Sequence, residues 1–573
     1  MKTMKKLLAM TLAVLLVLGC FAGCNQPEDT DRTVATRGEG PITTDPVTLK
    51  VLTPRHPEAT TDVESLWFFK YMEYWFKQQG YDVTFELLET HESQTTVSQM
   101  LGADSLPDIV WAIGLSAGNT VFYGQEEGMI LDWTPYLTDE WMPNLKAQFD
   151  ANPSMLAAHQ APNGGIYGLP YITPYPYSTI PGLVNRVFVR QSWLDQVGKK
   201  VPTTEEEFLD VLRAFKNIKL ENGQKTIPLL SDVDFLEKYL WTCLGYYGGE
   251  SAKYGTKFMI KDEQVMLPCY TEDYRDFIEI MHTLYTEGLI APEYFGGMSG
   301  AEITGLIADG NGGMHAWWTL QYVDDDYADQ VLLGPIPMGS NDDVYVSRLS
   351  DYTVNQIWAS SKTKYPEIVA MMVDYLYSEE GSWLYQYGPK QGEDPLGLVD
   401  GWYYDEAGNI TTKMVADGIY TAMELYCRDR IRSHDYAGLR VDPITTGTGE
   451  IITYKDAVTG ADYYSVHDRT MTRSSNDEWW RLETIEKWSN YATSIRLPGA
   501  YFSSEETAQV TDYELAIRQY VVAESVKFIT GKRPLSEIDA YFAKLKELGV
   551  EQYIKMYQDI YAQFIETTYG SKG

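Results

Sequence analysis

Hydrophobic and polar residues alternate along residues 47–51 (VTLKV), a period of two that predicts a β-strand with one buried face. In the following segment, 62–80, the apolar residues recur every three or four positions instead. This spacing predicts a helix that ends at Gly80. The same reasoning predicts a strand, a short helix and a further strand at 82–89, 95–101 and 106–113. Strands and helices therefore alternate, which is typical of an α/β unit with a doubly wound sheet.

A second well-marked helix is predicted after Thr204. Thr204 and Glu207 have the spacing of a capping box, in which each side chain bonds the backbone of the other. The apolar residues that follow recur on one face, which we expect to be buried: Phe208, Val211, Leu212 and Phe215. Two more helices are expected near the C-terminus, with Gly531 and Gly549 placed just beyond their ends.

The first residues have the pattern of an export signal. Three lysines precede an apolar run at 7–18, which is too short to span a membrane and is followed by small residues. The order Ala22-Gly23-Cys24 resembles a bacterial lipobox, so we expect Cys24 to be the lipidated residue, carrying acyl chains such as palmitate, after removal of residues 1–23. Cys20 is the alternative, and an ordinary cleaved signal is a third reading. Residues 25–46 are polar and read as a flexible tether.

Charge and cysteine content narrow the range of partners. The formal net charge of −35 would repel nucleic acids and anionic lipid surfaces, so neither is expected to bind. Beyond the lipid anchor only Cys243, Cys269 and Cys427 remain, too few for a disulfide framework, although one pair could form a bridge. The chain has 43 tyrosines and 15 tryptophans. Packing in the cores and between lobes would account for most of them, but these side chains also suit ligands with apolar faces and polar rims, such as sugars.

Several segments, taken together and in order, resemble family 1 of the extracellular solute-binding proteins, the lipoproteins that serve carbohydrate-type ABC importers. These segments are LPDIVWA (106–112), EEGMILDWTPYL (126–137), GGIYGLPY (164–171), the run 185–216, GNGGMHAWW (310–318), KYPEIVAMMVDYLYSEEG (364–381) and the run 526–549. Residues 395–500 depart most from the family, with GWYYDEAGNITT and ITYKDAVTGADYYS predicted to form inserted hairpins.

The resemblance implies an α/β fold of two lobes, the periplasmic-binding-protein-like fold of type II, joined by hinge crossings. On that pattern residues 47–172 and 353–490 would form the first lobe. Residues 173–352 and 491–573 would form the second. The ligand would lie in the cleft between them, beyond the carboxyl ends of the strands, which is also where open α/β sheets bind ligands.

The aromatic candidates for ligand binding each have a packing alternative. Trp111 ends a predicted central strand, so it would either stack on a ligand or pack in the core. Trp317 and Trp318 are adjacent and would point to opposite faces if extended, so we expect one to stack on the ligand and the other to pack in the core. Tyr175 and Tyr177 lie near the first crossing, where they would either bind or pack at the hinge.

The remaining candidates are polar residues near the predicted cleft and one tyrosine near the second crossing. Thr53 and Arg55 follow the first strand, and Arg55 could instead form an ion pair within its own lobe. Asp232 could accept hydrogen bonds from sugar hydroxyls, with a solvated surface role as its alternative. Tyr352 completes the set.

An enzyme is the rival interpretation. Gly114-Leu115-Ser116-Ala117-Gly118 matches G-x-S-x-G after a strand, and His434 or His467 with Asp435 or Asp468 follow in a permitted order for a surface-anchored serine esterase. The motif is short, and no oxyanion loop of the HGGG kind accompanies it. The sequence shows neither a zinc nor a P-loop motif, and no pair of carboxylates stands out for glycoside hydrolysis, so no cofactor or metal is expected.

These observations predict a non-enzymatic receptor on the outer face of the cytoplasmic membrane. We expect it to be a monomer that captures an oligosaccharide and delivers it to ABC permease subunits, with a separate ATPase supplying the energy. Peptides and other small polar solutes remain alternative ligands, because this fold serves many of them.

Overall fold

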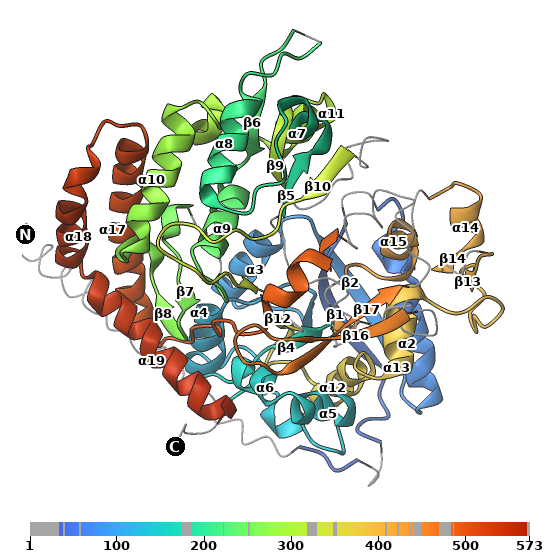
Figure 1. The fold of residues 1–573 in the computed structure, drawn as a ribbon. Coiled ribbons are helices and arrows are strands. Elements are labelled where there is room, and N and C mark those ends of the chain that lie inside the picture. Colours follow the sequence, from blue (N-terminus) through green and yellow to red (C-terminus); the bar gives the residue numbers. More distant parts are fainter. Residues whose placement is uncertain are drawn as a thin grey trace, which may run out of the picture.

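The computed structural model describes residues 34–37, 41–56, 59–173, 186–221, 223–249, 253–317, 329–347, 352–406, 410–420, 423–435, 437–440, 449–468, 483–484 and 486–569. The chain forms two lobes, each built on its own sheet, and in Figure 1 the second sheet lies above the first. None of the helices within these ranges has the length and apolar character needed to cross a bilayer.

The first lobe is built on a six-stranded sheet with the order β15-β4-β12-β3-β1-β2. Its strands are β1 (Val47–Pro54), β2 (Val83–Thr90), β3 (Ile109–Trp111), β4 (Leu169–Ile172), β12 (Tyr352–Ala359) and β15 (Gly438–Leu439). All are parallel except β12, which runs antiparallel to both β3 and β4. The strand from the middle of the chain therefore enters the centre of a sheet begun by the N-terminal residues.

Helices cover both faces of this sheet, which therefore separates two hydrophobic clusters. They are α2 (Trp67–Gln78), α3 (Ser93–Gly102), α4 (Ala117–Asn119), α5 (Pro143–Ala151), α6 (Pro153–His159), α12 (Pro366–Tyr375), α13 (Glu379–Tyr387), α14 (Lys413–Ala416) and α15 (Met423–Tyr426). A π-helical turn, Thr120–Glu126, continues α4, and another, Cys427–Ile431, continues α15. The larger cluster includes Trp67, Trp111, Trp133 and Trp141.

The second lobe has a four-stranded sheet with the order β10-β5-β9-β6, and a helical layer that includes the C-terminal part of the chain. Its strands are β5 (Arg186–Arg190), β6 (Ile227–Ser231), β9 (Gly312–Trp317) and β10 (Gln330–Leu332), with a small pair β7 (Met259–Lys261) and β8 (Gln264–Met266) beside them. Its helices are α7 (Gln191–Val197), α8 (Glu205–Phe215), α9 (Val233–Cys243), α10 (Asp273–Thr286), α11 (Gly300–Ala308), α17 (Ser504–Ile529), α18 (Ile538–Glu547) and α19 (Val550–Tyr569).

The structure confirms the predicted elements and adjusts their ends. Helix α2 stops at Gln78, and Gly80 follows it with φ +88°, a left-handed conformation that glycine adopts without strain. The Thr204 side chain accepts from Glu207 N as predicted, but the Glu207 carboxylate bonds the backbone and hydroxyl of Thr203 rather than Thr204. The second bond of the capping box, from the Glu207 carboxylate, therefore reaches the residue before the one that the sequence predicts.

Both inserted hairpins are present. The first is formed by β13 (Tyr403–Tyr404) and β14 (Ile410–Thr411), which lie with α14 at the right edge of Figure 1. The second is formed by β16 (Gly449–Lys455) and β17 (Asp462–Asp468). After it, β18 (Ala492–Thr493) pairs in parallel with β11 (Val346–Ser347). These additions explain why residues 395–500 depart from the family pattern.

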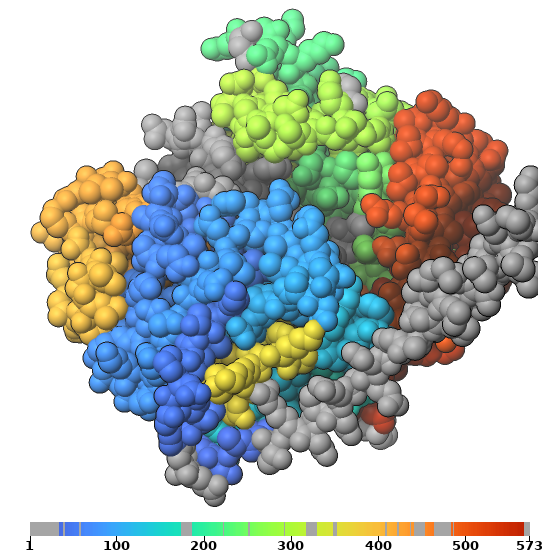
Figure 2. All heavy atoms as spheres, turned by 180° about the vertical axis from the view of Figure 1, so that it is seen from behind, coloured from blue at the N-terminus to red at the C-terminus, as the bar shows by residue number. Residues whose placement is uncertain are grey.

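The C-terminal helices bring the two lobes together along one side of the molecule. Seen from behind, the second lobe (green) lies above the first (blue), with these helices (red) beside them (Figure 2). Helix α19 contacts α6 of the first lobe, and Phe564 near its end packs against the cores of both lobes. The start of α17 also bonds the first lobe, since Ser504 N donates to Glu126 at 3.1 Å.

Candidate ligand site

Four candidate residues lie at one edge of the six-stranded sheet. Because β1, β3 and β4 are parallel, their carboxyl ends share an edge, and antiparallel β12 begins there. Thr53 and Arg55 at the end of β1, Trp111 at the end of β3 and Tyr352 at the start of β12 are therefore brought to this edge from distant parts of the sequence.

Two further candidates lie at the corresponding edge of the second sheet. Strands β6 and β9 are parallel, and Ser231 is opposite Ala316 in their register. Asp232 and Trp317 each come one residue after this pair, so they occupy neighbouring positions at the carboxyl edge. Trp318 lies outside the described residues.

The side chain of Trp111 points into the core of the first lobe. It has no exposed surface, its ring lies 5.5 Å from that of Phe69 between centroids, and its Nε1 donates to the Tyr385 hydroxyl at 3.1 Å. A buried tryptophan whose N–H is satisfied by another core side chain is a packing residue in this conformation. The geometry favours the packing alternative over ligand stacking at this position.

Arg55 fixes a distant segment onto the end of β1. Its guanidinium lies 3.6 Å from the Asp429 carboxylate and donates to the carbonyl oxygens of Arg428 and Thr61 at 2.9 and 2.8 Å. Beside it, the buried hydroxyl of Thr53 bonds that of Ser433. The ion pair within the lobe, the alternative considered for Arg55, is therefore present, and both residues hold the segment that carries Arg428 at the sheet edge.

That segment carries a compact group of charges. Arg428 donates to Asp435 at 2.9 Å and lies 3.3 Å from Glu424, and buried Arg432 donates to the same two carboxylates at 2.8 and 2.9 Å. Burial acts to raise the pKa of Asp435, but the hydrogen bonds from Arg428 and the charge of Arg432 outweigh it and hold that pKa well below its usual value. Asp435 therefore stays ionised at any physiological pH.

Two histidines complete this group. Arg428 Nη1 lies 3.2 Å from His56 Nε2, within hydrogen-bond distance. Burial lowers the pKa of His434, although the nearby Asp435 opposes this shift. We refer to His56, Arg428, Arg432, His434 and Asp435 as the arginine cluster. It combines guanidinium, carboxylate and imidazole groups, which are kinds of group that can bond hydroxyls. Of the two guanidiniums, that of Arg428 is the more exposed.

Asp232 has a structural task besides any ligand contact. Its side chain caps α9, accepting from Phe235 N at 2.8 Å, and it is half-buried rather than fully solvated. Burial raises its pKa. The carboxylate is thus held in a fixed orientation at the edge of the second sheet, where a cap leaves part of the group facing outward.

Tyr352 is held at the contact between the lobes. It is buried, its hydroxyl donates to Ser154 O at 3.3 Å, and the Arg496 guanidinium lies 5.2 Å above its ring. This position suits hinge packing. Tyr175, Tyr177 and the predicted lipidation site Cys24 lie outside the described residues, and of Trp317 only the backbone is described.

The proposed nucleophile motif has an ordinary backbone. Ser116 caps α4, accepting from Asn119 N at 3.2 Å, and its φ of −66° is unstrained, whereas the left-handed residue after β3 is Ala112 with φ +55°. A nucleophile elbow places the strain at the serine itself. Among the described side chains no histidine bonds Ser116.

Metal and disulfide chemistry find no support within the described ranges. These ranges contain no group of three or more histidine, cysteine or acidic side chains placed to hold a metal ion. Cys243, Cys269 and Cys427 are buried free thiols, so no pair of them forms the bridge that the sequence left open. Burial raises the pKa of Cys243 and Cys427 to about 12, which keeps both as thiols.

The arginine cluster is the part of the site that the sequence did not reveal. The sequence indicates His434 and Asp435 only as partners of Ser116, and it assigns no role to Arg428 or Arg432. The signal was present in the run ELYCRDRIRSHD (424–435), which places three arginines among three acids in a strongly acidic chain. The run is placed at the sheet edge by contacts with Arg55 and His56, which lie more than 360 residues away in the sequence.

Comparison with known proteins identifies related chains. Residues 64–383 match the family model for bacterial extracellular solute-binding proteins. Among characterised relatives, the fructooligosaccharide ABC transporter substrate-binding protein FusA of Streptococcus pneumoniae serotype 4 is 22% identical over 533 residues, 90% of each chain. Lipoprotein LipO of Bacillus subtilis is 23% identical over 317 residues, 54% of this chain and 55% of LipO.

Solved structures share the fold. The S. pneumoniae FusA complex with kestose superposes with a TM-score of 0.65 at 19% identity, covering 90% of this chain and 99% of that one. A solute-binding protein described as binding human milk oligosaccharides (HMO), from Bifidobacterium longum infantis, superposes with a TM-score of 0.70 at 18% identity, covering 90% and 98%. The two-lobed α/β fold predicted from the sequence is therefore confirmed.

Proposed function

We propose that this chain, which belongs to the bacterial extracellular solute-binding protein family, captures an oligosaccharide between its two lobes and delivers it to an ABC transporter. The observation that carries this proposal is the pair of sheet edges: the arginine cluster at the first and Asp232 at the second. Both edges present oriented polar side chains at the carboxyl ends of strands, where open α/β sheets bind ligands.

A sugar suits these edges because its hydroxyl groups both donate and accept hydrogen bonds. The Arg428 guanidinium can donate, the Asp232 carboxylate can accept, and an imidazole can do both. FusA, which shares the fold, is described in complex with kestose and as a fructooligosaccharide-binding protein, which supports an oligosaccharide of related size here. Tyr175, Tyr177 and one of Trp317 and Trp318 are the proposed stacking residues, with Thr53 and Arg55 supporting the cluster and Tyr352 at the hinge.

Binding would act by shifting the balance between open and closed forms. A ligand that touches both lobes only when they close favours closure by its difference in affinity for the two forms. In this account the lobes comprise residues 47–172 with 353–490 and residues 173–352 with 491–573. The hydrophobic cores suggest two adjustments to these boundaries. Tyr352 packs with the first lobe, and Trp488 packs with the second.

The receptor would be non-enzymatic and attached to the outer face of the membrane through a lipid on Cys24, where it would meet the permease subunits as a monomer. Lipoprotein LipO among the relatives supports the anchor. Mass spectrometry of the membrane fraction tests it: acylated Cys24 is expected, and it should be lost in Cys24→Ala and retained in Cys20→Ala. An unmodified N-terminus, or a lipid on Cys20, would overturn this part of the proposal.

The transport function is tested with a panel of oligosaccharides. Residues 25–573 are screened for ligands that raise the melting temperature by an amount that grows with their concentration, followed by analysis of the recovered sugar. The proposal expects at least one oligosaccharide to stabilise the protein and to be recovered intact. Cleaved products that disappear in Ser116→Ala would instead support the esterase.

A further inference from the structure

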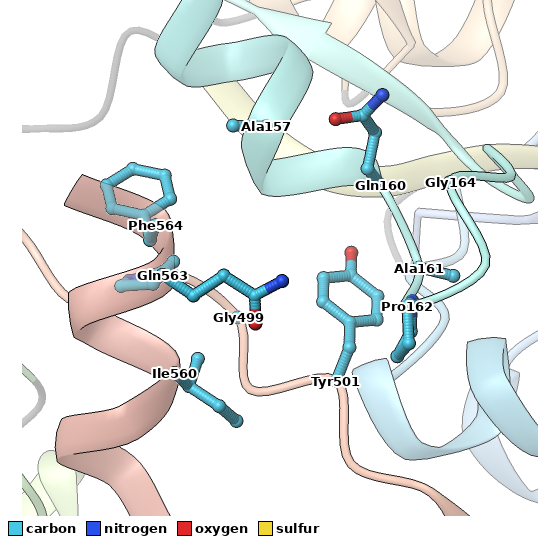
Figure 3. A pocket seen from close by; sticks show the side chains of 11 residues that line it. Ala157, Gln160, Ala161, Pro162, Gly164, Gly499, Tyr501, Ile560, Gln563 and Phe564 are labelled. Carbon is cyan, nitrogen blue, oxygen red and sulfur yellow. The ribbon is translucent and has the colours of Figure 1, made fainter. Parts of the chain in front are cut away.

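A cavity of about 220 Å³ lies where the C-terminal helix meets the first lobe. Its walls come from three segments: α6 with the loop after it, residues 498–501, and the last turns of α19. In Figure 3 the Gln563 side chain extends from α19 toward the ring of Tyr501, with Phe564 at the side of the same open space. The cavity is thus enclosed by parts of the chain that belong to different lobes.

The chemistry of the lining is unusual for this chain. In a protein in which 22% of the residues are charged, none of the eleven residues around this cavity carries a charge. An ionic ligand would leave its charge without a partner there, at a considerable cost. The ligand that fits is therefore neutral, which excludes phosphates, carboxylates and amines.

The remaining lining groups favour a ring-shaped polyol. Tyr501, Phe564 and Ile560 offer apolar surface, and the carboxamides of Gln160 and Gln563 can each donate and accept, as hydroxyl groups do. The Tyr501 hydroxyl is already occupied, since it donates to Ala158 O at 3.0 Å and accepts from Asn355. Its fixed ring is therefore available only as a surface on which a ligand can stack.

The volume limits the size of the ligand. Pockets for larger organic ligands hold roughly 300–1,000 Å³, so this cavity is too small for an oligosaccharide. A space below this range suits a ligand no larger than a single sugar ring.

We propose that this cavity, called the hinge pocket, is a second binding site that takes one neutral monosaccharide or a polyol of similar size. It is distinct from the site between the sheet edges. Because α6 and α19 lie on its opposite sides, a bound sugar would contact both lobes. Any coupling with the oligosaccharide site would be reciprocal, each ligand changing the affinity of the other by the same factor.

The test uses residues 25–573 and isothermal titration calorimetry with D-glucose, D-galactose, D-fructose, D-mannose and N-acetyl-D-glucosamine. D-glucuronate and D-glucosamine serve as charged counterparts. Ala157→Leu fills the hinge pocket from α6, and Gln563→Leu removes a carboxamide that lines it. The free energy of unfolding of both variants is measured in parallel, so that a loss of binding is separated from a loss of folding. Ala562→Leu is the matched control, because Ala562 is exposed on α19 and does not line the pocket.

The proposal expects at least one neutral sugar to bind the wild type and Ala562→Leu equally. Binding at one site per chain should weaken by about tenfold or more in both Ala157→Leu and Gln563→Leu, and the charged counterparts should bind at least as weakly. The proposal is overturned if none of the neutral sugars binds, or if Ala157→Leu binds them as the wild type does, since the sugar then occupies another site.

Discussion

The hydroxyl of Tyr501 accepts a hydrogen bond from Asn355 Nδ2 at 3.1 Å, across 146 residues of sequence. Asn355 lies in β12 of the first lobe, while Tyr501 precedes α17, which packs in the second. Asn355 has φ +53°, a conformation that non-glycine residues seldom adopt, and its Nδ2 also bonds Leu115 O at 3.3 Å. A strained conformation of this kind persists where the surrounding structure holds the residue in place. Here the bonds of Asn355 hold the segment around Tyr501 against the first lobe.

Tyr501→Phe should loosen this crossing. It removes the bonds to Asn355 and to Ala158 O but keeps the ring, so we expect a loss of about 1–2 kcal/mol in the free energy of unfolding, measured in urea. Tyr491→Phe is the control, because Tyr491 is 38% exposed. Equal stability of the Tyr501 and Tyr491 variants would mean that the two bonds contribute nothing to holding the crossing.

Trp111→Phe separates packing from ligand stacking. The smaller ring leaves space in a fully buried position and loses the bond to Tyr385, so the free energy of unfolding should fall by about 1–3 kcal/mol. The Kd for an oligosaccharide found in the screen should stay within about twofold of the wild type. A large rise in Kd with unchanged stability would return Trp111 to the ligand site.

Asp232→Asn tests the second sheet edge. Asparagine caps a helix about as well as aspartate, so the stability should change little, while loss of the charged acceptor should weaken oligosaccharide binding by about tenfold. Asp234→Asn is the control, because Asp234 is exposed in the first turn of the same helix. Calorimetric titration of both variants measures the difference, and equal affinities would remove Asp232 from the site.

Burial of His159 predicts a loss of stability in mild acid. Its Nε2 is buried without a partner, and burial lowers its pKa to about 4, below the value of about 6.5 expected in the unfolded chain. Below about pH 6.5 the unfolded chain therefore takes up a proton that the folded one refuses. The stability falls by about 1.4 kcal/mol per pH unit until about pH 4.

Urea unfolding at pH 7, 6 and 5 measures this slope. His159→Gln keeps a donor for Met155 O and cannot titrate, so it should reduce the pH dependence by one proton, although buried His315 adds to the slope in the same direction. An unaltered slope in His159→Gln would show that this histidine is protonated in the folded protein.

Local signals in the sequence were sufficient for the helices and strands, whereas the two-lobed arrangement was implied by the family resemblance. Gly80 and Thr204 mark helix ends through backbone chemistry that acts over a few residues, so their positions follow from sequence alone. Asp232 was identified as a candidate, but its capping role became visible only when the length of β6 and the start of α9 were known.

Contacts between segments that lie far apart in the sequence could not be predicted from such local signals. The Arg55 and Asp429 pair and the Tyr501 and Asn355 bond join residues separated by 374 and 146 positions. No pattern in either segment specifies the other partner. Trp111 illustrates the limit for single residues, since the end of a central strand suits a ligand contact and a core position equally well. Most of the arginine cluster lies between the two inserted hairpins, within the residues where the family resemblance is weakest.

The most direct test of oligosaccharide capture is calorimetric titration of residues 25–573 with the best oligosaccharide from the screen, together with analysis of the sugar afterwards. The account predicts saturable binding of one oligosaccharide per chain, weakened by Asp232→Asn and by Arg428→Ala, with the sugar recovered intact. Binding that neither variant affects, or recovery of cleaved sugar, would contradict it.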